Sequence, residues 1–169
     1  MSEQLENFWW TFVQSAACPP GVDAGKTPPA FAFGDNPTLA DELGQLVYAG
    51  IKTATCGTLW EWEHDRDPLP QTGQLEIVLD GHGKPLCVIE MVEVTIKPYN
   101  EVDASFAYAE GEDDRTLESW RREHWKYFSR VLPQIGRAPD EAMPLVCRRF
   151  RVVFKRQQRI ETRTDLFHR

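Results

Sequence analysis

The fold prediction starts from Gly50-Ile51-Lys52-Thr53-Ala54-Thr55, because this stretch joins a well-marked helix to a β-rich segment. Upstream, Asn36-Pro37 is a typical helix start, since asparagine caps free amides and proline fits the first helical position. The apolar face of this helix is Leu39, Leu43, Leu46 and Val47, and Gly50 is suited to ending it. The sequence therefore places an amine, Lys52, and a hydroxyl, Thr55, close together at an element boundary, where functional groups often lie.

The remaining patterns mix helices with hairpin-connected strands. We expect strands over residues 75–79, 86–97 and 145–154, with Asp80-Gly81-His82-Gly83 as the hairpin between the first two. Helices are expected over residues 3–15, 101–109 and from Thr116 onward, and a helical turn over 60–64. Residues 52–56 fit a strand or a strand-to-helix turn. This order predicts an α+β domain with a curved antiparallel or mixed sheet that can close into a small barrel.

Composition sets the class of protein. The 169 residues, 41% of them hydrophobic and 27% charged, suit one soluble domain with a substantial core. No apolar run approaches the roughly 18 residues that span a bilayer, and the N-terminus does not resemble a signal peptide, so we expect no membrane partner and a cytoplasmic protein. The cysteines and histidines are scattered, which predicts free thiols and no structural zinc site. The cysteines are Cys18, Cys56, Cys87 and Cys147.

Charge is distributed unevenly along the chain. The net charge of −7 argues against tight non-specific binding to a nucleic-acid backbone. Residues 101–118 contain seven acids and one base, whereas residues 148–169 contain eight bases and two acids. A local basic surface can therefore exist on an acidic protein, although a basic C-terminal tail can equally be a solvated terminus.

Six stretches, in this order, resemble the ASCH family, a branch of the PUA-like β-barrel folds. They are Phe33-Gly34-Asp35-Asn36-Pro37, Gly50-Ile51-Lys52-Thr53-Ala54-Thr55, Leu79-Asp80-Gly81, Pro85-Leu86-Cys87-Val88-Ile89, Phe106-Ala107-Tyr108-Ala109-Glu110-Gly111-Glu112 and Trp120-Arg121-Arg122-Glu123-His124-Trp125. The resemblance implies a barrel of about five or six mixed strands flanked by helices. We expect this domain over residues 31–155, preceded by a packed helix and loop over 1–30 and followed by a basic tail over 156–169.

The resemblance also implies RNA or nucleotide-related ligands. Some members look like single-strand ribonucleases, for which the catalytic lysine is Lys52 and a late-helix serine is Ser129. Shorter members are amidohydrolases on acylated cytidine, whose lysine, threonine and glutamate correspond to Lys52, Thr55 and Glu112, with Glu110 as a competitor for the acid. We expect a hydrolase, with the ribonuclease as first choice and the amidohydrolase as second. A non-catalytic RNA-binding module is the third alternative.

The chemistry of the residues leaves several roles open. As a base, Lys52 needs a pKa lowered by burial, whereas as a cation it stabilises developing negative charge without any shift. Glu112 can orient Lys52 or the substrate. Together with Asp113 or Asp114 it can also bind a divalent metal ion, so a metal cofactor stays open.

Candidate binding residues are predicted from their residue types. Trp60 can stack on a base, and Arg149 and Arg151 can contact phosphate, although core packing and surface exposure explain them as well. His124 lies on an apolar helix face, where a hydrogen-bonded core histidine is the commoner outcome.

Overall fold

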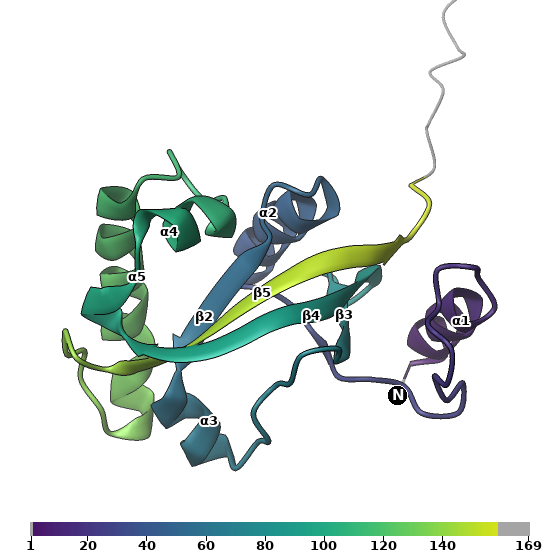
Figure 1. Ribbon diagram of the computed structural model, residues 1–169, viewed down its shortest axis with the longest axis horizontal. Helices are drawn as coiled ribbons and strands as arrows, with labels where there is room; N and C mark the ends of the chain where they lie inside the picture. Colours follow the sequence, from purple (N-terminus) through teal and green to yellow (C-terminus); the bar gives the residue numbers. More distant parts are fainter. Residues whose placement is uncertain (1, 159–169) are drawn as a thin grey trace, which may run out of the picture.

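The computed structural model describes residues 2–158 and contains one five-stranded sheet with helices around it (Figure 1). The helices are α1 (Glu3–Val13), α2 (Pro37–Tyr48), α3 (Leu59–Asp65), α4 (Ala104–Glu110) and α5 (Leu117–Val131). The strands are β1 (Ala30–Phe31), β2 (Ala54–Thr58), β3 (Leu75–Leu79), β4 (Pro85–Pro98) and β5 (Pro144–Lys155). Two short 3-10 helices cover Tyr99–Glu101 and Leu132–Ile135.

The sheet has the strand order β1-β3-β4-β5-β2. Strand β1 runs parallel to β3, and the other pairs are antiparallel, so the predicted mixed sheet is confirmed. The predicted closure into a barrel is not confirmed, because no ladder joins the edge strands β1 and β2 among the described residues. The long central strands β4 and β5 are irregular, with register shifts at Val88/Ile89 and Met91/Glu93. Such shifts bend a sheet, but the two-residue β1 offers little edge to close against.

The element that leads into the site forms as the sequence predicts. The Asn36 side chain accepts a hydrogen bond from the Leu39 amide at 2.9 Å, and Gly50 follows the helix with φ +76°. Residues 54–58 are a strand, and Thr58 then starts α3 through a capping box with Glu61. The chain therefore runs from α2 straight into the edge strand β2, which is paired with β5.

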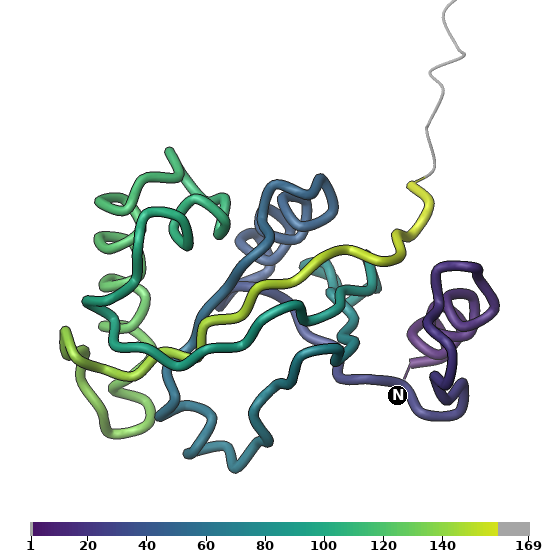
Figure 2. The backbone as a smooth tube through the Cα atoms, viewed as in Figure 1, coloured from purple at the N-terminus to yellow at the C-terminus, as the bar shows by residue number. Residues whose placement is uncertain are grey.

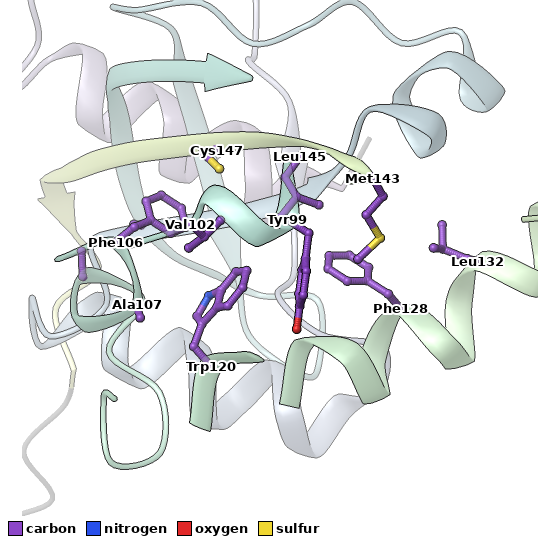
Figure 3. Packing of buried hydrophobic residues seen from close by; sticks show 12 residues of the cluster. Tyr99, Val102, Phe106, Ala107, Trp120, Phe128, Leu132, Met143, Leu145 and Cys147 are labelled. Atoms are coloured by element: carbon purple, nitrogen blue, oxygen red, sulfur yellow. The ribbon is translucent and has the colours of Figure 1, made fainter. Parts of the chain in front are cut away.

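Three apolar clusters hold the helices against the sheet. Helix α5 packs Trp120 and Phe128 toward β5, as Figure 3 shows beside Leu145 and Cys147. Helix α2 packs on the sheet through a second cluster that includes Leu43, Val47, Leu86, Ile89 and Met91. Helix α1 packs Trp9 and Phe12 against Ile77 and Val88 in a third. The backbone trace in Figure 2 shows the result: α2 and the α4–α5 segment, far apart in sequence, stand near the same end of β2.

Two further expectations can be compared with the structure. All four cysteines are free, as predicted. Within residues 2–158, no helix combines the length and the apolar character needed to cross a bilayer. The predicted basic tail lies largely outside the described residues, which end at residue 158.

Candidate functional site

A pocket of about 690 Å³ lies between α2, β2 and the α4–α5 segment. This volume is within the range of small-molecule sites, about 300–1,000 Å³. Its lining combines apolar and aromatic residues with an unusual number of charged ones. The lining residues used below are Phe33, Glu42, Thr55, Cys56, Glu110, Glu112, Asp113, Trp120, Arg122, Glu123, His124, Lys126 and Arg130.

Lys52 lies behind the pocket wall, with only 1% of its surface exposed. Its Nζ donates to Glu112 Oε1 at 2.7 Å, to Glu110 Oε2 at 3.2 Å and to the Glu110 carbonyl at 3.4 Å. Burial alone would lower the pKa of Lys52, but the two carboxylates outweigh it and raise the pKa above 10.5. Lys52 is therefore a cation at neutral pH, which excludes the role of a neutral base in this arrangement.

Glu110 is the centre of the charge cluster and is also 1% exposed. Its Oε2 contacts both Lys52 Nζ and His124 Nε2 at 3.2 Å. Burial would raise the pKa of Glu110, but Lys52 and then His124 lower it well below its usual 4.5. The other oxygen, Oε1, is buried and has no hydrogen-bond partner among the described residues. Glu112 is 30% exposed at the side chain and faces the pocket more openly.

Close backbone packing brings the two acids to Lys52. The Thr53 amide donates to the Ala109 carbonyl at 2.7 Å, which ties the end of α4 to the start of β2. Gly111 then turns the chain between the two glutamates with φ +71°. A Cβ atom at Gly111 would lie 2.7 Å from the Ile51 carbonyl oxygen, so only glycine fits this approach. The Ala-Glu-Gly-Glu motif thus places one glutamate on each side of a glycine turn.

Thr55 and Cys56 of β2 supply the neutral reactive groups of the pocket. Thr55 is 9% exposed and lines the pocket. Thr53 instead directs its hydroxyl to the Ala109 carbonyl at 3.3 Å, in keeping with its predicted structural role. Burial, and next the Glu110 carboxylate, raise the pKa of the Cys56 thiol well above 9.0.

Four predicted binding residues do not line this pocket. Trp60 packs beside the α5–β5 cluster, and the Arg137 guanidinium lies 4.7 Å from its ring centre. Ser129 is exposed on α5. Arg149 and Arg151 pair with Glu93 and Glu90 at 3.5 and 3.4 Å. Their proposed contacts with substrate stay predictions.

The structure adds two residues that the sequence did not single out. Cys56 was expected to be one free thiol among four, and His124 was expected to be a core histidine. His124 does stack on Trp120, with ring centres 4.2 Å apart, but its Nε2 also faces Glu110 in the pocket. The spacing Trp-x-x-x-His puts both rings on one face of α5, yet no sequence signal links either to Cys56.

The candidate metal-ligand cluster lies elsewhere than the one that the sequence left open. Asp113 bonds Ser119 and Arg122, and Asp114 bonds Thr116, so neither joins Glu112 in a ligand cluster. Among the described residues, the one group with metal-ligand spacing is Cys56, Glu110 and His124. Their ligand atoms lie within 4.8 Å of one another.

The chain belongs to the ASCH domain family, whose model matches residues 29–154. ASCH domains generally bind nucleic acids. The chain is similar to the crystal structure of a protein from Enterococcus faecalis V583, with 35% identity and a TM-score of 0.84 over 100% of this chain and 99% of that one. It is also similar to an ASCH domain from Lactobacillus crispatus JV V101, with 31% identity and a TM-score of 0.82 over 91% and 96% of the two chains. No curated protein matches the chain.

Proposed function

We propose that this ASCH domain is an amidohydrolase that takes an acylated pyrimidine nucleoside into the pocket. The observation that carries the proposal is the buried Lys52–Glu110–Glu112 cluster, whose two acids line the same nucleoside-sized pocket as Thr55. These residues correspond to the lysine, threonine and glutamate of the amidohydrolases in the family. The resemblance leaves open whether Glu110 or Glu112 is the catalytic glutamate, and both side chains contact Lys52.

The charges of the lining favour a small neutral substrate over a phosphodiester. Five acids line the pocket against three bases. The acids are Glu42, Glu110, Glu112, Asp113 and Glu123, and the bases are Arg122, Lys126 and Arg130. A phosphate group would bring further negative charge toward the two carboxylates beside Lys52, whereas a nucleoside amide brings none.

We assign one role to each of the three residues from the contacts that it makes. All three N–H groups of the Lys52 ammonium are used on acceptors of Glu110 and Glu112, so Lys52 acts by holding the two acids in place. Glu112, the more exposed acid, accepts the proton of the attacking hydroxyl. Thr55 Oγ1 adds to the acyl carbon, the amide C–N bond breaks, and the proton taken up by Glu112 passes to the leaving amine of the nucleoside. Water then hydrolyses the Thr55 ester, which releases the acyl group as a carboxylic acid and restores the threonine hydroxyl.

Turnover of N4-acetylcytidine tests this function directly. We expect Thr55→Val and Glu112→Gln to lower kcat/KM by about 100-fold or more, because each removes a group that acts in the chemical step. Thr53→Val is the matched control, since Thr53 immediately precedes β2, two residues from Thr55, and its hydroxyl bonds the backbone. Turnover that survives in Thr55→Val, or no turnover by the wild type, would contradict the amidohydrolase.

A second observation favours the ribonuclease as the alternative. A neighbouring hollow of about 630 Å³ is lined by Tyr99, Asn100, Arg121, Arg122, Trp125, Lys126 and Glu141, and it shares Arg122 and Lys126 with the first pocket. Trp125 is 36% exposed there between basic side chains of α5. An exposed tryptophan flanked by arginine and lysine is a typical platform for single-stranded nucleic acid.

Binding and cleavage of single-stranded RNA separate this alternative from the first. If RNA is the substrate, Trp125→Ala weakens binding by about 1–3 kcal/mol, and affinity falls steeply as salt rises. Trp10→Ala is the matched control, because Trp10 is also exposed, at 56%, but lies on α1. RNA binding without cleavage, and without turnover of N4-acetylcytidine, would leave the non-catalytic binding module.

A further inference from the structure

We propose that Cys56, Glu110 and His124 form a binding site for one divalent transition metal ion of the zinc type, with an open coordination position toward the pocket. The three residues come from β2, the end of α4 and the middle of α5, so the fold and not a local motif brings them together. All three also line the pocket.

The spacing of the donor atoms suits a tetrahedral ion. The three ligand atoms lie within 4.8 Å of one another. His124 Nε2 lies 3.2 Å from Glu110 Oε2, and Oε1 is the second oxygen of the same carboxylate, which reaches the ion by a rotation of that group. With zinc–nitrogen and zinc–oxygen bonds of about 2.0–2.2 Å, a tetrahedral site separates two such donors by about 3.4 Å. Small side-chain adjustments therefore complete the site.

The histidine is already oriented as a ligand. His124 Nδ1 lies 2.9 Å from the Trp120 carbonyl oxygen, which can only accept a hydrogen bond. Nδ1 therefore carries a proton. Nε2 faces the ionised Glu110 Oε2 at 3.2 Å and donates its own proton to it, so an incoming metal ion would replace this proton and take the Nε2 lone pair. Metal-binding histidines typically use this arrangement, in which a backbone carbonyl fixes the ring and its tautomer.

The glutamate has an oxygen to spare. Lys52 and His124 hold Glu110 Oε2, whereas Oε1 is buried and makes no hydrogen bond of good geometry among the described residues. The Trp120 indole N–H is also buried without a partner, and it is close enough to this carboxyl to help lower its pKa. A buried carboxylate oxygen with no partner costs about 1–3 kcal/mol or more, so such an atom calls for an explanation. A metal ion on Oε1 satisfies it while Lys52 keeps its bond to Oε2.

The donor set and the charges select the kind of ion. One sulfur, one nitrogen and one oxygen donor suit zinc and similar ions, whereas magnesium and calcium prefer oxygen alone. Lys52, Glu110, Glu112 and a Cys56 thiolate together carry a charge of −2, which a divalent ion neutralises. Three protein ligands leave the fourth position to water or substrate on the pocket side, as in catalytic rather than structural zinc sites.

Cobalt binding by the untagged, metal-stripped full chain tests the site without any assay of turnover. We expect one Co²⁺ per chain, a thiolate-to-cobalt charge-transfer band, and the strong visible absorption of a four-coordinate ion. Added Zn²⁺ should displace the cobalt. Cys56→Ser should abolish the charge-transfer band, and His124→Gln should weaken binding at least about tenfold. The matched controls Cys18→Ser and His64→Gln, at a loop thiol and an exposed imidazole outside the pocket, should bind as the wild type does.

Three results would overturn the site: no stoichiometric binding by the wild type, a charge-transfer band that survives Cys56→Ser, or a band that disappears in Cys18→Ser. Circular dichroism of each variant shows whether it is folded, and the wild-type result decides the question even if a variant is not. Because the readout is spectroscopic, loss of this site leaves the amidohydrolase and ribonuclease tests unaffected.

Discussion

At the scale of single residues, the two glutamates around Gly111 have different roles although both touch the same lysine. Glu110 is buried between Lys52 and His124, whereas Glu112 keeps 30% of its side chain exposed. The buried acid compensates charge that cannot reach water. The more exposed acid can exchange its partner for a substrate. Replacing Glu110 should therefore mainly lower stability, and replacing Glu112 should mainly lower activity.

Replacing each glutamate by glutamine tests this division. Glu110→Gln leaves the buried Lys52 ammonium with one carboxylate fewer, and we expect the free energy of unfolding to fall by about 3–5 kcal/mol. Glu112→Gln keeps the Lys52–Glu110 pair and should lower the free energy of unfolding by about 1 kcal/mol. Urea unfolding of both variants gives the comparison. Equal losses would mean that the exposed acid is as structural as the buried one.

The sequence predicts the lysine, threonine and glutamate of the site better than the cysteine and histidine that lie with them. Lys52, Thr55 and Glu112 follow from an element boundary and from family motifs. Thr55 and Glu112 line the pocket, and Lys52 lies behind its wall in contact with Glu112. Cys56 and His124 could not be assigned to it, because a cysteine in a strand and a histidine on an apolar helix face give no signal of what lies opposite. That information depends on the packing of β2, α4 and α5.

At the scale of elements, the junction between α4 and β2 is the tightest part of the site. A Cβ at Gly111 would approach the Ile51 carbonyl oxygen to 2.7 Å and Lys52 Cα to 3.0 Å. Gly136 has nearly the same backbone angle, φ +73° against +71°, but a Cβ added there would meet no atom within 4 Å. Substitution at Gly136 therefore tests the cost of a positive φ alone, whereas substitution at Gly111 tests that cost together with a steric clash.

Alanine at these two glycines should have unequal effects. Gly136→Ala carries only the left-handed backbone penalty, about 1–2 kcal/mol. Gly111→Ala adds a clash that pushes α4 from Lys52, and we expect a further loss of about 1–3 kcal/mol together with lost turnover. Thermal or urea unfolding measures the first effect and substrate turnover the second. A Gly111→Ala variant no less stable than Gly136→Ala would contradict the tight junction.

A second element-scale prediction concerns the ion pair across the central strand. Glu76 of β3 accepts from Arg148 of β5 at 3.1 Å, over β4 between them. Burial outweighs the attraction of Arg148 and raises the pKa of Glu76 above 4.5. A raised carboxyl pKa stabilises the fold at acid pH, and this contribution is lost as pH rises through the folded-state value.

We therefore expect the wild type to lose stability relative to Glu76→Gln as pH rises from 4.5 toward neutrality. Urea unfolding of both proteins at several pH values measures the difference, so that titrations common to both cancel. A difference that grows in favour of the wild type over this range would show that Arg148 outweighs burial.

Most helices and strands could be predicted from the sequence, whereas the open or closed form of the sheet could not. Caps, turns and apolar spacing mark α2, the β3–β4 hairpin and α5 in the sequence, because these signals are local. Strand β1 has two residues and gives no periodicity to detect. Whether a curved sheet closes depends on which edges meet, and the edges β1 and β2 are set by long-range packing.

At the scale of the whole molecule, the first thirty residues are the part whose role is least evident from the family. The family match begins at residue 29, yet the similar protein of Enterococcus faecalis V583 aligns over 100% of this chain. Helix α1 packs Trp9 and Phe12, 2% and 0% exposed, on Ile77 and Val88 of the sheet. The segment covers the end of the sheet opposite α4 and α5 (Figure 1).

If α1 belongs to the cooperative core, removing its buried ring should destabilise the whole chain. Phe12 also contacts Phe154 of β5, with ring centres 5.5 Å apart, so Phe12→Ala opens a cavity between helix and sheet. We expect a loss of about 3–5 kcal/mol in a single unfolding transition. Trp10→Ala, at an exposed position of the same helix, should change stability by about 0.5 kcal/mol or less. A small loss of unfolding free energy in Phe12→Ala, or a separate early unfolding transition for α1, would contradict this expectation. Residues 1–30 would then fold independently of the rest of the domain. The pocket, which lies at the far end of the sheet, would not depend on them.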